Sequence, residues 1–157
     1  MGRLTVVGCG TVVPEPERAA SCYHVELDGS GVLLDCGPGA LQAMVRIGIA
    51  WSGITDLALT HFHADHLGAV PGLFFALRHA LHPDRRRRPL DVWGPAGTRT
   101  LFRRLSRTLG DYIVDPGFPV RVHELGPGDV IGLEGGPSLS AHATPHTDES
   151  LAYRLDG

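Results

Sequence analysis

The hydrophobic positions of this 157-residue chain follow two spacings, one typical of strands and one typical of helices. Short runs rich in Val, Ile and Leu, bounded by Gly or Pro, predict strands. These runs cover residues 3–8, 54–60, 90–94, 119–125, 129–133, 138–144 and 150–155. Two further apolar runs lie within residues 22–37, where the connecting Asp28-Gly29-Ser30-Gly31 predicts a hairpin.

Apolar residues at steps of three and four predict helices in three other regions. Their positions are Leu41, Met44 and Val45; Leu67, Val70, Phe74, Leu77 and Leu81; and Leu101, Leu105 and Leu109. The second region predicts an amphipathic helix of about four turns, with Pro71 in its first turn, where a missing N–H costs little. Because strands and helices are mixed along the chain, we expect an α/β layered fold with a mixed sheet.

Composition changes this picture little. The length suits one domain over residues 1–157, and 43% hydrophobic with 20% charged residues is typical of globular proteins. No apolar run approaches the roughly 20 residues that span a bilayer, and residues 1–10 lack a signal-peptide pattern. Cys9, Cys22 and Cys36 make an odd count without a CxxC pair, which favours reduced thiols. We therefore expect a cytoplasmic protein.

Charge excludes some functions and leaves one open. The net charge of −3 gives no global signal for nucleic acid, and all 14 basic residues are arginine. Without lysine, a P-loop NTPase, a Schiff-base enzyme and a lysine general base are excluded within this chain. The run Arg85–Arg88 lies between prolines, which favours a solvated loop; a salt-dependent grip on a phosphate backbone is the alternative.

Candidate chemistry is concentrated in His61, His63, Asp65 and His66, which follow a predicted buried strand and precede a helix. Ligand-type side chains crowded in this way are compensated by a divalent cation, and imidazole and carboxylate are ligands that zinc accepts. His61 and His63, two positions apart, can project to the same side. Asp65 and His66 lie where the backbone turns into the helix, so one loop could serve two neighbouring metals.

Residues 60–66, "THFHADH", match in full the T-H-x-H-x-D-H signature of the metallo-β-lactamase superfamily. Four other segments resemble, in the same order, the ribonuclease Z-like branch of that superfamily. They are "GCGTVVPEPERAAS", "VLLDCGPGALQAM", "PLDVWGPAGT" and "TPHTDESLAYRL". The resemblance implies a single domain with the αββα four-layer sandwich and mixed sheets of that superfamily.

The resemblance also implies a hydrolase that uses a metal-activated hydroxide, with two Zn²⁺ per complete site and Mn²⁺ or Fe as alternatives. His61, His63 and His146 would bind the first metal, and Asp65 and His66 the second. Asp65 would be catalytic, because it would orient the attacking water or take its proton. His142 lies near His146 and competes for the third ligand position. Asp35, which ends a predicted strand in a glycine turn, would brace the metal loop.

The family pattern is not complete within 157 residues. A bridging aspartate and a last histidine ligand would follow residue 157, so we expect a domain that is incomplete at its C-terminal side. Pro38 and Ala40 stand where ribonuclease Z usually has Glu and Thr, and no long Gly/Pro-rich arm is present. These departures favour a general phosphodiesterase or hydrolase of the branch over a dedicated tRNA-processing enzyme.

Several functions remain open from the sequence. Phosphodiester hydrolysis is the leading hypothesis, and hydrolysis of another ester, a thioester or a lactam is a same-fold alternative. A third is a non-catalytic metal-binding fragment. A dinucleotide fingerprint in "VVGCGTVVP" fails, because Val13 occupies the third glycine position and "PEPER" follows where a helix should begin. The expected partners are a phosphodiester or RNA substrate and no membrane, and a homodimer is left open.

Overall fold

The computed structural model describes residues 2–27, 29–79 and 86–157. The strands are β1 (Arg3–Gly8), β2 (Cys22–Leu27), β3 (Ser30–Leu34), β4 (Asp56–Ala58), β5 (Leu90–Gly94), β6 (Val120–Glu124), β7 (Val130–Gly132), β8 (Ser138–Ala143) and β9 (Leu151–Asp156). The helices are α1 (Ala40–Arg46), α2 (Ala64–Leu67), α3 (Val70–His79) and α4 (Thr98–Leu109), with short 3₁₀ turns at Trp51–Gly53 and Asp111–Ile113. Every predicted strand is present in this set.

The larger sheet has six strands in the order β1-β2-β3-β4-β5-β6. The predicted hairpin forms β2 and β3, which pair antiparallel with Tyr23 opposite Leu34. From β3 to β6 neighbouring strands are parallel, since each connection returns the chain to the edge from which the previous strand began. The sheet is therefore mixed, as predicted, and β3, β4 and β5 all end at one edge.

The glycine-rich segment after β1 has a structural explanation that does not involve a nucleotide. β1 pairs antiparallel with β2, so it does not begin the βαβ unit that a dinucleotide fingerprint requires. A Cβ built on Gly8 would lie 2.1 Å from the carbonyl oxygen of Ala20. Glycine is thus needed there because two backbone segments approach closely.

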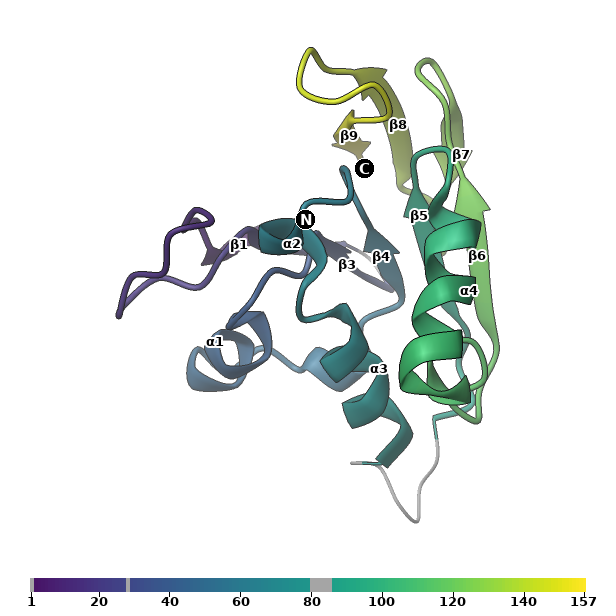
Figure 1. Cartoon of the computed structure of the whole chain (residues 1–157). Coiled ribbons are helices and arrows are strands. Elements are labelled where there is room, and N and C mark those ends of the chain that lie inside the picture. The colour runs from purple at the N-terminus through teal and green to yellow at the C-terminus, as the bar shows by residue number, and fades with distance from the viewer. Residues whose placement is uncertain (1, 28, 80–85) are drawn as a thin grey trace.

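Helices α1, α3 and α4 cover one face of the six-stranded sheet (Figure 1). The face of α3 that meets the sheet is made of Val70, Leu73, Phe74 and Leu77, all at most 1% exposed. The ring of Phe74 packs edge-on against Phe102 of α4, with centroids 5.6 Å apart. This layer holds the larger hydrophobic core and fixes the strands that carry the histidine loop.

The single helix predicted from Leu67 to Leu81 is wrong at its start, because α2 ends at Leu67 and α3 begins only at Val70. The break follows from contacts with the turn after β3. The N–H of Ala69 donates to the carbonyl of Cys36 at 2.9 Å, and a Cβ on Gly68 would lie 3.0 Å from Pro38. Pro71 lies in the first turn of α3, as expected, and Leu81 lies outside the described residues.

The second sheet is antiparallel, has the order β7-β8-β9, and lies against the other face of the larger sheet. Its buried residues pack with those of β2, β3 and β4 to form a second core. The residues of that core are Val25, Val32, Ala58, Leu125, Leu133, Leu139, Ala141 and Leu151. The described residues thus supply three layers, α, β and β, of the predicted four-layer sandwich, and no second helical layer lies among them.

Part of the arginine run is not the solvated loop that was predicted. Arg86 is only 8% exposed, and its guanidinium donates to the carbonyl oxygens of Ser52, Arg88 and Pro89 at 2.7–3.0 Å. It also lies over the ring of Phe118, 5.1 Å from the centroid. Arg86 is therefore a packing residue, while Arg87 and Arg88 are exposed and Arg85 lies outside the described residues.

Among the described residues, no helix has the length and apolar character needed to cross a membrane.

Candidate metal centre

The histidine loop leaves the sheet at the end of β4 and meets the loop between β8 and β9. The N–H of Leu151 donates to the carbonyl of Thr60 at 2.9 Å, and the hydroxyl of Tyr153 donates to the carbonyl of Leu59 at 2.9 Å. These bonds attach the start of β9 to the residues directly before His61. Two segments more than 80 residues apart in sequence are thereby held side by side at one edge of the molecule.

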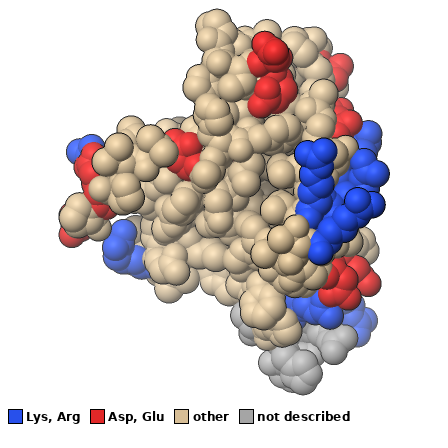
Figure 2. All heavy atoms as spheres, viewed as in Figure 1, with Lys and Arg blue, Asp and Glu red and all other residues tan. Residues whose placement is uncertain are grey.

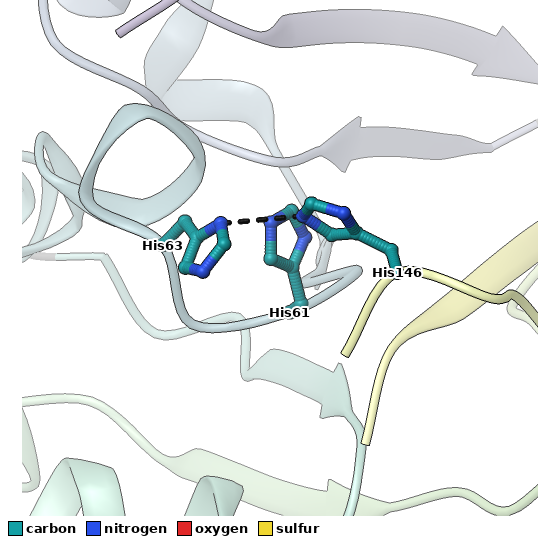
Figure 3. Close-up of side chains that lie close together, drawn as sticks. All are labelled: His61, His63 and His146. Carbon is teal, nitrogen blue, oxygen red and sulfur yellow. Dashed lines mark hydrogen bonds between the residues drawn. The ribbon is translucent and has the colours of Figure 1, made fainter. Parts of the chain in front are cut away.

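Three imidazoles converge where these segments meet, and Figure 3 shows their rings turned toward one another. One ligand atom from each of His61, His63 and His146 can be chosen so that all three lie within 4.8 Å of one another. His146 Nε2 is 3.2 Å from His63 Nδ1. The ring of His61 is 4.6 Å from that of His63 and 4.7 Å from that of His146, centroid to centroid.

The chemistry of this group fits a cation. His61 is 4% exposed, and its Nε2 is buried without a hydrogen-bond partner among the described residues. Burial, followed by the neighbouring His66 and His63, lowers the pKa of His61 below its usual value, and Asp35 only partly opposes this. A buried, neutral imidazole with an unpaired nitrogen directed at two others is the donor set that a divalent metal accepts.

A hydrogen-bond network behind the imidazoles is centred on Asp35 and Thr60. Asp35 is 2% exposed, and its carboxylate accepts from the Thr60 N–H at 2.8 Å, from the Thr60 hydroxyl at 2.9 Å and from His66 Nδ1 at 2.7 Å. Because the Thr60 hydroxyl gives its one proton to Asp35, it accepts from His61 Nδ1, 2.9 Å away. Both His61 and His66 are then protonated at Nδ1, which leaves each Nε2 free as a ligand.

His66 and Asp65 lie beside the three-imidazole group and are not part of it. The ring of His66 is 4.2 Å from that of His61, and its Nε2 is 3.9 Å from Asp65 Oδ2. The hydrogen bond to Asp35 is the largest of the effects that raise the pKa of His66, while burial lowers it. The predicted site residues thus form two adjoining sets. One is His61, His63 and His146, the other is Asp65 and His66, and the ring of His61 contacts both sets.

The turn after β3 holds this second set in place. Asp35 has φ of +57°, an uncommon conformation for a residue other than glycine, which lets its carboxylate turn back toward Thr60. The N–H of Cys36 donates to the carbonyl of His66 at 2.7 Å. A Cβ built on Gly37 would lie 2.1 Å from the carbonyl oxygen of Asp65, so glycine is needed at position 37 for this close approach.

His142 does not belong to the site. It lies exposed on β8, and its Nε2 contacts the hydroxyl of Ser140 at 3.3 Å. The structure therefore places His146, and not its rival, beside the histidine loop.

Two residues that organise the site were not singled out from the sequence, namely Thr60 and Ser150. The Ser150 hydroxyl is buried and bonds within the loop that presents His146: it accepts from the Thr147 N–H at 3.0 Å and contacts the carbonyls of Thr144 and Thr147. The signal for Thr60 is a hydroxyl directly before a histidine, and the signal for Ser150 is a hydroxyl at the end of the short loop that carries His146. Such side chains often bond to nearby backbone groups.

Fold and site together define a metal-binding α/β sandwich, and residues 16–157 match the family described as the Metallo-beta-lactamase superfamily. The chain belongs to this family. Family membership implies a divalent-metal site, and the three converging imidazoles form a group that could hold such an ion.

The resemblance to ribonuclease Z is confirmed by curated relatives. The chain is 36% identical to "Ribonuclease Z" of Haloferax volcanii over 98% of its own length and 46% of that protein. It is 35% identical to "Ribonuclease Z" of Methanosarcina acetivorans over 99% of its length and 48% of that protein. The chain thus spans about half the length of the curated relatives it matches.

Solved structures share the fold. The short form of human tRNase Z superposes with a TM-score of 0.79 at 22% identity, covering 99% of this chain and 65% of that one. The metallo-beta-lactamase fold protein YhfI from Bacillus subtilis gives a TM-score of 0.80 at 19% identity, covering 99% and 58%. The predicted fold class is confirmed by these neighbours.

Proposed function

We propose that this chain carries the metal-binding part of a hydrolase that cleaves phosphodiesters in the manner of ribonuclease Z, with RNA as the natural substrate. The observation that carries the proposal is the buried, unpartnered Nε2 of His61 directed at His63 and His146. A buried polar atom without a partner is costly, and a bound cation removes that cost. The relatives named Ribonuclease Z support the choice of substrate.

The proposed first-metal ligands are His61, His63 and His146, and the proposed second-metal ligands are Asp65 and His66. Zinc is the proposed metal, with Mn²⁺ or Fe as alternatives, because imidazole suits zinc and iron and the carboxylate of Asp65 suits Mn²⁺. Bound there, such an ion would lower the pKa of a bound water to about 7 and would polarise a phosphoryl oxygen.

The remaining steps belong to side chains of this chain. Asp65 is the proposed catalytic residue: its carboxylate is one-fifth exposed, reaches the His66 side of the cluster, and can hold or accept a proton of the attacking water. Asp35 and Thr60 do not reach this position. They hold the ring orientation and Nδ1–H tautomer of His61 and His66, so that each Nε2 is left as the ligand atom.

The chain is proposed to be a single domain over residues 1–157 whose second metal site is completed by ligands outside it. Two observations support this. The chain spans about half the length of its curated relatives, and three histidines converge at His61, whereas among the described residues His66 has only Asp65 beside it as a further candidate ligand for the second metal. A cytoplasmic location is a further part of the proposal, and a homodimer is left open.

The test begins with metal bound per chain, measured by elemental mass spectrometry, and continues with turnover. Hydrolysis of bis(p-nitrophenyl) phosphate would be compared with hydrolysis of a β-lactam and of an aryl thioester, with Zn²⁺, Mn²⁺ or Fe²⁺ supplied. Asp65→Asn is expected to lower diesterase turnover by about 100-fold or more, since a general base contributes about that factor. Asp148→Asn, an exposed carboxylate in the His146 loop, is the matched control.

Near one metal and no turnover would support a metal-binding fragment whose activity needs the missing ligands. Faster turnover of the β-lactam or thioester than of the phosphodiester would overturn the substrate class. Equal turnover by Asp65→Asn and the parent chain would overturn the role of Asp65.

A further inference from the structure

Helix α4 carries a one-sided concentration of positive charge. Its twelve residues, Thr98–Leu109, include four arginines and no carboxylate, in a chain whose net charge is −3. The arginines are Arg99, Arg103, Arg104 and Arg107, and all are exposed. At about 100° per residue they fall within an arc of about 140° on the helix surface, which excludes the buried Thr98 and Phe102. Figure 2 shows basic side chains gathered over the position of α4.

The residue before this helix contacts the loop that carries the candidate metal ligands, and the helix leads away from that contact. A Cβ built on Gly97, the residue before α4, would lie 3.3 Å from the ring of Phe62, which stands between His61 and His63. Arg99, Arg103 and Arg107 are four residues apart, so they lie about 6 Å from one another along the helix axis. The result is a line of cations whose first member, Arg99, comes two residues after the Gly97–Phe62 contact.

Most of this line is not neutralised by neighbouring groups. Arg99 is 3.5 Å from Glu124, whose other oxygen caps the start of α4 by accepting from the N–H groups of Gly97 and Arg99. Within the described residues, no carboxylate lies at ion-pair distance from Arg103, Arg104 or Arg107. Several other arginines do have such partners; these pairs are Arg3–Glu26, Arg18–Glu15, Arg78–Asp111, Arg121–Asp91 and Arg154–Asp156.

We propose that Arg103, Arg104 and Arg107 bind the phosphate backbone of an RNA strand that leaves the metal centre along α4. The inference rests on the proposed RNA substrate and names the surface that holds it beyond the scissile bond. Arginine suits this role because its planar guanidinium donates to a phosphate through two N–H groups at once. A membrane surface fits less well, because Leu109 is the one markedly exposed apolar side chain among the residues of α4.

The test compares Arg103→Gln/Arg104→Gln/Arg107→Gln with the parent chain, both loaded with metal. The probe is a short fluorescein-labelled oligouridylate with phosphorothioate linkages, and the readout is anisotropy as a function of salt. Losing three phosphate contacts should reduce the slope of log affinity against log salt by about 2, at about 0.7 per contact for single strands. At 0.1 M salt this is a loss of about 100-fold in affinity.

Two controls separate this inference from the proposed function. Arg3→Gln/Arg18→Gln/Arg46→Gln removes the same charge from exposed positions outside α4 and should leave the salt slope unchanged. Hydrolysis of bis(p-nitrophenyl) phosphate, which is too small to reach beyond the first turn of α4, should be equal in the α4 variant and the parent. Loss of diesterase activity in the parent would count against the proposed function and not against the α4 surface.

Two results would overturn the inference. One is an unchanged salt slope and affinity in the α4 variant. The other is an equal loss of affinity in the two triple variants, which would mean that only the total charge matters. If the α4 variant instead lost binding to phosphatidylserine vesicles while keeping RNA affinity, α4 would be a membrane-facing surface and the RNA assignment would be wrong.

Discussion

Thr60→Val tests whether the network behind the imidazoles sets metal affinity. The substitution keeps the shape of the side chain and removes a hydroxyl that donates to Asp35 at 2.9 Å and accepts from His61 Nδ1 at 2.9 Å. Loss of a hydrogen bond to a carboxylate costs about 1.5–3 kcal/mol, and the orphaned Nδ1–H adds about 1–3 kcal/mol. We therefore expect the free energy of unfolding of the metal-free protein to fall by about 3 kcal/mol or more.

The effect on metal binding should be separable from this loss of stability. With Nδ1–H no longer held by Thr60, His61 can rotate or change tautomer, and such changes behind a ligand typically weaken metal affinity about 10–100-fold. Thr55→Val is the matched control, because the Thr55 hydroxyl is buried and also donates to a carboxylate, Asp56, at 2.7 Å, but lies at the opposite end of β4. It should lower stability similarly and leave metal affinity unchanged.

The assay is competition between the protein and a chromophoric chelator for Zn²⁺ or Co²⁺, run beside urea unfolding of the metal-free chains. The reasoning is refuted if Thr60→Val binds metal as tightly as the parent. It is also refuted if Thr60→Val and Thr55→Val lose affinity equally, because metal binding would then only report on general stability.

Three further predictions concern the fold around the site. Gly37→Ala should cost about 1–3 kcal/mol of stability and weaken metal binding, because its Cβ would meet the Asp65 carbonyl, whereas Gly132→Ala, with open space at that position, should be close to neutral by urea unfolding. Arg86→Met should lower the free energy of unfolding by about 2–4 kcal/mol, because three carbonyls lose their donor, and should leave RNA affinity unchanged. The exposed control Arg87→Met should change neither stability nor RNA affinity. Burial lowers the pKa of His24, an effect that Glu26 opposes and Arg3 reinforces. As pH falls, the unfolded state is therefore protonated at this histidine before the folded state is, and the free energy of unfolding should decrease below about pH 6.5. Measured by urea unfolding of chelator-treated protein, this decrease should be smaller in His24→Leu.

The sequence predicted the site residues that are close together in the chain, for a physical reason. His61, His63, Asp65 and His66 lie within six consecutive positions, on the loop after β4 and in α2, so their spacing alone limits where the side chains can point. Strands and helices were predicted for the same reason, because each is specified by a local period of apolar residues. Where contacts across the chain compete with that period, as at Gly68 and Ala69, the prediction of one continuous helix was wrong.

The contacts that could not be predicted are those between distant segments. The residues alone left His142 and His146 as rivals, and only the family resemblance of the segment around His146 favoured it. The pairing of β8 with β9 and the bond from Leu151 to Thr60 are what place His146 beside the histidine loop. The same holds for Arg86, which looks like a member of a charge run until its guanidinium is seen among three carbonyls. Such roles depend on contacts between segments that are distant in the sequence, and a local pattern of residues does not specify those contacts.

The distribution of the three imidazoles over two sheets has a thermodynamic consequence. His61 and His63 follow β4 of the larger sheet, while His146 lies between β8 and β9 of the smaller one. A cation held by all three binds only when the sheets are packed together through Leu139, Ala141 and Val32. Metal binding and sheet packing are therefore linked, and each stabilises the other by the same free energy. The bonds from Leu151 and Tyr153 to the histidine loop reduce the cost of this alignment, because they hold the two segments in register before an ion arrives.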